Sequence, residues 1–92
     1  MFEICDRYAD RMADLHKLIS KVKTDIKELY LEYGVKGYID IRDYGGFNGV
    51  KVENDILYIR DKGCVDWHID YIDDLHLLLY ILHEMYHFIP EE

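Results

Sequence analysis

An apolar pattern with a repeat of seven residues runs through the first third of the chain. Its members follow one another at alternating intervals of three and four, and no proline or glycine interrupts them before Gly34. This spacing predicts one stripe of an α-helix, and glycine is typical of the position just after a helix. We therefore expect one long helix over 1–34. The pattern consists of Cys5, Tyr8, Met12, Leu15, Ile19, Val22, Ile26, Leu29 and Tyr33.

The length of this helix favours a homodimer. A helix of about 30 residues is about 45 Å long, whereas a compact domain of this size is only about 30 Å across. The helix would therefore extend beyond its own domain, unless it breaks into two. Because the pattern continues to the overhanging end, we expect a second copy to cover it. The predicted dimer interface is Tyr8, Met12, Leu15, Ile19, Val22, Ile26 and Leu29.

The middle third changes to a period of two, which is typical of half-buried strands. Apolar and polar residues alternate over 35–42, and a glycine-rich turn follows. Two further strands are expected over 50–52 and 56–60, and a short fourth over 65–69. Trp67 stands at an alternating position of that fourth segment, which favours a place in the core. An antiparallel meander over 35–69 is the prediction.

The last segment, 70–89, is expected to be an amphipathic helix, with acidic residues at its start and Pro90 at its end. Its apolar residues, including Leu79 and Tyr86, cover a wide arc that would be buried. The predicted fold is thus a single α+β domain over 1–92. It has a long N-terminal helix, a three- to four-stranded antiparallel sheet and a C-terminal helix packed on the sheet.

The C-terminal segment contains the spacing H-E-x-x-H, as His83, Glu84 and His87. On one helix this spacing places two histidines a turn apart, as zinc ligands, beside a glutamate that serves as general base. The motif would fall on the solvent arc with His76, and few residues follow it to supply a third ligand. Three interpretations therefore stay open: a zinc hydrolase with catalytic Glu84, a non-catalytic metal site, and a His-rich helix face without metal. We favour the last, and hence no cofactor.

The net charge of −8 is concentrated in residues 35–92, which hold five Lys and Arg against twelve Asp and Glu. Such a surface repels phosphate backbones, so we expect no direct nucleic-acid binding. The most apolar stretch is too short and too polar to span a bilayer. Two cysteines far apart in the sequence are typical of a reducing compartment. We therefore expect a cytoplasmic protein without membrane contact.

Tyrosines among acidic residues are typical of protein interfaces, because aromatic side chains supply contact area at low entropy cost. The favoured hypothesis is a non-enzymatic protein-binding module with a basic partner surface. By analogy with small acidic phage and mobile-element inhibitors, it would mimic nucleic acid and occupy a nucleic-acid-binding surface of its target. The alternatives are the metal-dependent hydrolase and a purely structural dimerisation module. The candidate contact residues are Tyr38, Asp40, Tyr44, Asp61, Asp66, Asp70, Asp73 and Asp74.

Overall fold

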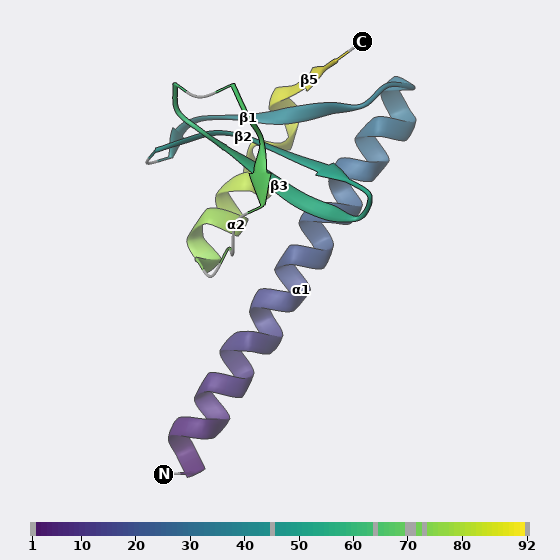
Figure 1. The fold of residues 1–92 in the computed structure, drawn as a ribbon. Helices are drawn as coiled ribbons and strands as arrows, with labels where there is room; N and C mark the ends of the chain where they lie inside the picture. The colour runs from purple at the N-terminus through teal and green to yellow at the C-terminus, as the bar shows by residue number, and fades with distance from the viewer. Residues whose placement is uncertain (1, 45, 64, 70–71, 73, 92) are drawn as a thin grey trace.

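The computed structural model describes residues 2–44, 46–63, 65–69, 72 and 74–91, with the side chains of all of these except 2–10 and 43. The chain forms two α-helices, one short 3-10 helix and five strands (Figure 1). In chain order these are α1 (Phe2–Tyr33), β1 (Gly37–Tyr44), β2 (Phe47–Glu53), β3 (Ile56–Asp61), β4 (His68–Ile69), α2 (Leu75–His83), η1 (Met85–His87) and β5 (Phe88–Pro90).

The strands form one antiparallel sheet in the order β4-β3-β2-β1-β5. Residues of both helices and of the sheet share one hydrophobic core, so α1 and α2 cover the same face of the sheet. Figure 1 shows this two-layer arrangement, with the strands on one side and the helices on the other. The α+β prediction is confirmed, although the sheet has five strands rather than three or four. No helix in the described ranges is long and apolar enough to cross a membrane.

Helix α1 is continuous over 32 residues, and its N-terminal part extends beyond the sheet and α2 (Figure 1). From Leu15 onward its apolar stripe packs on the chain's own core, where Leu15, Val22 and Ile26 are buried. These three residues are buried in the chain's own core, so they are not available to a second copy as they stand. Three other residues of the predicted dimer interface, Met12, Ile19 and Leu29, are partly buried against the same core. The side chain of Tyr8 lies outside the described residues, and the homodimer stays a prediction.

The hydroxyl group of Tyr30 joins α1 to the sheet. Its single proton lies within reach of two acceptors, the backbone oxygens of Gly37 at 2.9 Å and Val52 at 3.1 Å, and its oxygen accepts from the Val52 N–H at 3.0 Å. It therefore satisfies backbone groups where β1 and β2 do not pair directly. Burial raises the pKa of this hydroxyl group above its ordinary value. Because buried backbone groups need a partner, this contact sets how α1 crosses the strands.

The predicted alternation holds in β1, β2 and β3, where the buried side chains point to the helices and their neighbours point away. Two details of the prediction are wrong. A shift of register between Asp40 and Tyr44 interrupts the alternation, so Tyr44 points to α2 and its ring lies 5.2 Å from that of Tyr80. Trp67 is not in the core. Its indole ring lies against Gly49 and Tyr38, on the face of the sheet opposite the helices.

The prediction of a helix over 70–89 is wrong at both ends. Helix α2 begins only at Leu75, after Ile72 and the capping residue Asp74, which are not helical. Helix α2 ends at His83, a 3-10 turn follows, and residues 88–90 form β5. This strand pairs with β1, with Phe88 opposite Ile39 and Pro90 opposite Gly37. Phe88 is buried, and the centroid of its ring lies 4.9 Å from the ring centroid of Tyr33 at the end of α1. The strand is more stable here than another helical turn because it buries Phe88 and forms a ladder with β1. Pro90 is tolerated because β5 is an edge strand of the sheet.

Gly37 is the position where this pairing depends on the absence of a side chain. A Cβ atom at Gly37 would contact the backbone oxygen of Ile89 and lie 2.6 Å from the Phe88 ring. We expect Gly37→Ala to lower the free energy of unfolding by about 1–3 kcal/mol, the usual cost of overpacking. Urea unfolding measures it. The matched control is Gly46→Ala, because a Cβ atom there meets nothing within 4 Å. Equal stability of the two variants would contradict this account of Gly37.

Candidate functional site

The face of the sheet opposite the helices is crossed by a row of side chains, one from each strand. Residues that pair directly across antiparallel strands share a face. Ile89 is opposite Tyr38, Lys51 is opposite Tyr58, and Tyr58 is opposite Ile69. Tyr38 and Lys51 flank the directly paired Ile39 and Val50, and so they are neighbours as well. The row over all five strands is Ile89, Tyr38, Lys51, Tyr58 and Ile69.

Trp67 packs on the middle of this row from the segment before β4. A Cβ atom at Gly49 would lie 2.8 Å from its Cη2 atom, so the glycine makes room for the indole ring. The ring of Tyr38 meets the indole edge-on, at 5.6 Å between centroids. We call the set Tyr38, Lys51, Tyr58, Arg60 and Trp67 the outer-face cluster.

Two cations of the outer-face cluster lie over its aromatic rings. The Arg60 guanidinium carbon is 4.7 Å from the Tyr38 ring centroid and 4.6 Å from that of Trp67. The Lys51 ammonium is 4.9 Å from the Trp67 centroid. Attraction between a cation and an aromatic ring at such distances holds these long side chains in place. The surface is therefore largely ordered before any partner arrives.

The charges of the cluster are only partly neutralised. Lys51 pairs with Glu53 at 3.4 Å. Arg60 donates a hydrogen bond to the amide oxygen of Asn48 at 2.9 Å and forms no ion pair with a carboxylate of a described residue. The guanidinium group can therefore still donate hydrogen bonds to a carboxylate of a partner molecule. Sequence reasoning missed Lys51, Tyr58 and Arg60. Their alternation with buried Val50, Leu57 and Ile59 was the available signal.

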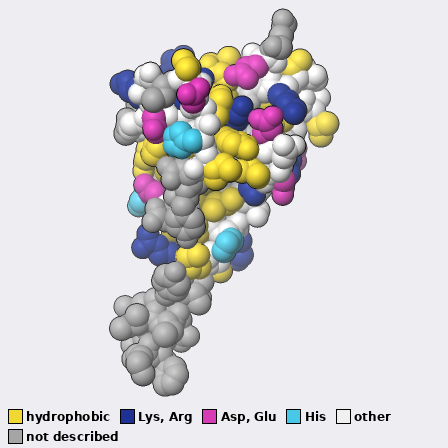
Figure 2. Space-filling model, in the orientation of Figure 1, with side chains coloured by type: hydrophobic (Ala, Val, Ile, Leu, Met, Phe, Trp, Pro, Cys, Tyr) yellow, Lys and Arg dark blue, Asp and Glu magenta, His cyan; other side chains and the backbone are white. Residues whose placement is uncertain are grey.

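The predicted contact residues do not form one surface. Asp40 lies beside Tyr38 on β1 and pairs with Arg42 at 3.4 Å. Asp61 is 3.3 Å from the Nε2 atom of His68. Asp66 is exposed in the loop before β4, and Tyr44 and Asp74 lie on the helix side. Asp70 and Asp73 are outside the described residues. On the face that Figure 2 shows, acidic side chains are interspersed with Lys and Arg.

Tyr44 and Asp74 have a structural role at the start of α2. The Asp74 carboxylate caps the helix by accepting from the backbone N–H groups of His76 at 2.9 Å and Leu77 at 3.3 Å. It also accepts from the Tyr44 hydroxyl at 2.8 Å. The hydrogen bond with Tyr44 lowers the pKa of Asp74, and the same bond raises the pKa of Tyr44. Both residues thus hold α2 to the end of β1.

The H-E-x-x-H segment does not lie on one helix, which corrects the premise of the hydrolase and metal interpretations. His83 is the last residue of α2 and is exposed, whereas His87 lies in η1. Glu84 is buried at the end of α2, and its carboxylate lies 3.0 Å from the Nε2 atom of His87. The spacing places two histidines side by side only on a continuous α-helix. The described residues contain no group of three or more His, Cys, Asp or Glu that could hold a metal ion.

Two side chains of the C-terminal segment that were expected to be buried are exposed. Tyr86 is 70% exposed and Leu79 is 52% exposed. The expected solvent arc is also broken, because Glu84 is buried while His76 and His83 stay exposed. Tyr86 and Glu84 lie beyond His83, where the period of α2 no longer sets the direction of side chains, whereas Leu79 is exposed within α2 itself.

Comparisons with protein-family models, with curated proteins and with solved structures gave no match for this chain. The function is therefore argued from the geometry above.

The contact between Asp74 and Tyr44 predicts a pH dependence of stability. Because the pKa of Asp74 is lowered on folding, its contribution is present above the unfolded value of about 3.9 and is lost as the pH falls through the folded value. Asp74→Asn keeps a capping oxygen but cannot ionise. We expect the wild type to unfold at a higher urea concentration than Asp74→Asn at pH 7, and the two to converge as the pH falls through the folded pKa of Asp74.

The matched control is Asp14→Asn, an exposed aspartate on α1. The role of the Asp74 charge would be contradicted if the wild type and Asp74→Asn differed in their urea midpoint of unfolding by the same amount at neutral and at acid pH.

Proposed function

We propose that this chain is a non-enzymatic protein-binding module that binds its partner through the outer-face cluster. The observation that carries the proposal is the placement of both helices on one face of the sheet, while the opposite face presents three aromatic and two cationic side chains. Tyrosine, tryptophan and arginine are the residues that most often dominate binding energy at protein interfaces.

The preorganisation of the cluster supports this choice. Binding costs free energy for each flexible side chain that becomes ordered. Arg60 is already held between Tyr38 and Trp67, and Trp67 is fitted against Gly49. A partner that supplies a carboxylate to Arg60 and apolar groups to the rings would therefore order few additional side chains.

Apolar residues extend this surface to both edges of the sheet. Ile89 on β5 is 37% exposed and Ile69 on β4 is 64% exposed. An exposed aliphatic side chain at each end of an aromatic row resembles the apolar centre of an interface rather than a solvated surface. The proposed contact area thus spans the full width of the sheet.

The net charge supports a finer proposal about the partner. A chain with a net charge of −8 attracts basic proteins over long distances, even where the contact itself has mixed charge. We therefore propose a basic partner whose surface normally holds nucleic acid, so that the chain acts as a stoichiometric inhibitor. In this proposal the cluster provides the contact and the overall charge accelerates association.

The test is binding by a double variant of the cluster, Tyr58→Ala with Arg60→Ala. Proteins captured by the immobilised full chain from cells of its source would be identified and purified, and their Kd measured by calorimetry. We expect the variant to raise Kd at least tenfold, since truncation of interface hot spots costs about 2 kcal/mol or more. The partner should also bind nucleic acid less well in the presence of the chain.

The matched control removes one tyrosine and one cation elsewhere, Tyr86→Ala with Lys17→Ala, both of which are exposed. Circular dichroism checks that both variants fold. If the purified partner bound the two variants with the same Kd, the outer-face cluster would not be the binding surface.

A further inference from the structure

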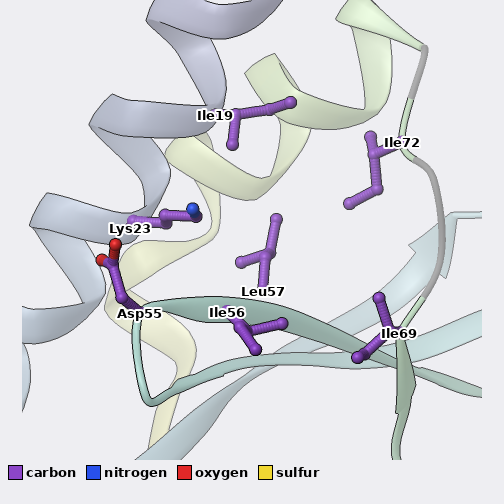
Figure 3. A pocket seen from close by; sticks show the side chains of 7 residues that line it. All are labelled: Ile19, Lys23, Asp55, Ile56, Leu57, Ile69 and Ile72. Atoms are coloured by element: carbon purple, nitrogen blue, oxygen red, sulfur yellow. The ribbon is translucent and has the colours of Figure 1, made fainter.

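A second candidate site is an apolar groove between α1 and the β3–β4 side of the sheet, which includes no residue of the outer-face cluster and shares Ile69 with the row beside it (Figure 3). Its volume is about 220 Å³. Five of the described lining residues are aliphatic, and the two charged ones come from α1 and from the turn before β3. The lining residues are Ile19, Lys23, Asp55, Ile56, Leu57, Ile69 and Ile72.

The aliphatic wall of the groove is open to solvent. Ile56 is 39% exposed and Ile69 is 64% exposed, whereas Leu57 and Ile72 are buried beneath them. Figure 3 shows Ile69 and Ile72 on one side of the groove and Ile19 on the other, with Leu57 between them. An apolar ligand in this position would cover side chains that otherwise stay in water.

The described residues at the groove carry a net positive charge, although the chain as a whole is acidic. The Asp55 carboxylate forms an ion pair with Lys27, and it points to α1 rather than into the groove (Figure 3). The hydrogen bond and charge of Lys27, followed by the charge of Lys23, lower the pKa of Asp55. Among the described residues, two ammonium groups therefore face one carboxylate, which leaves one positive charge.

Lys23 is the cation that a ligand can reach. Its side chain extends from α1 toward the groove (Figure 3), and it forms no hydrogen bond or ion pair with another described residue beyond its longer-range attraction to Asp55. The aliphatic stem of a lysine can pack on an apolar surface while its ammonium group stays accessible to solvent. An anion at the groove would gain a charge-assisted hydrogen bond without displacing an existing one.

We propose that this groove binds a small carboxylate with an aliphatic tail. The carboxylate would pair with Lys23, and the tail would lie on Leu57, Ile69 and Ile72. The groove is smaller than the roughly 300–1,000 Å³ of sites for drug-sized ligands. Octanoate is therefore the probe.

Calorimetric titration of the full chain with carboxylates of increasing length tests the proposal. We expect saturable binding of octanoate, with a Kd that falls about fourfold for each methylene from pentanoate to octanoate and then levels off. Lys23→Met keeps an apolar stem and removes the charge, so it should raise the Kd of octanoate about tenfold. Octanol, which has the same total number of carbons and no carboxylate, should bind the wild type and Lys23→Met equally.

Two further variants make the result specific. Lys17→Met is the same substitution at an exposed site of α1 and should leave the Kd of octanoate unchanged. Ile69→Asn removes an exposed wall residue, so the chain should still fold while octanoate binding weakens. The proposal is overturned if octanoate shows no saturable binding at millimolar concentrations, or if Lys23→Met and Lys17→Met bind it equally. Neither result depends on the outer-face cluster.

Discussion

The pairing of β5 with β1 is the interaction on which the rest of the structure depends. Three residues after η1 return to the start of β1, where Gly37 leaves room for the Phe88 ring and the Ile89 backbone. The backbone N–H of Glu91 extends the contact by donating to Lys36 at 2.8 Å. The pairing closes the sheet beside the end of α1, because Phe88 packs on Tyr33. A chain that continued α2 would leave both the β1 edge and this apolar site unfilled.

The same pairing determines which function the geometry supports. It ends α2 at His83, so the histidines of H-E-x-x-H are no longer neighbours on one helix face, and Glu84 is buried against His87. It also adds Ile89 to the row of side chains that crosses the outer face. The pairing of β5 with β1 thus argues against a catalytic helix face and in favour of a binding surface. The proposed protein-binding role follows from the open face of a two-layer sheet.

Local periodicity was enough to predict α1 and the first three strands, because each stripe of apolar residues there meets the core directly. It failed where distant residues decide. The segment 84–89 has apolar residues at helical spacing, and only its contact with Gly37 makes a strand more favourable. The register shift before Tyr44 and the packing of Trp67 on Gly49 also involve partners that no local pattern reveals. Lys51, Tyr58 and Arg60 occupy alternate strand positions that solvent-facing residues also occupy, so their assembly around Trp67 was not predictable.

The conformation of residues 84–90 in solution is the measurement that tests this account most directly. Backbone NMR assignment of the full chain gives the Cα and Cβ chemical shifts of each residue. The account expects extended shifts over Phe88–Pro90 and nuclear Overhauser contacts between the Ile89 and Tyr38 backbones across the ladder. Helical shifts that continue from Leu75 to Ile89 would contradict it. They would return His83 and His87 to one helix face and make the metal site the leading interpretation.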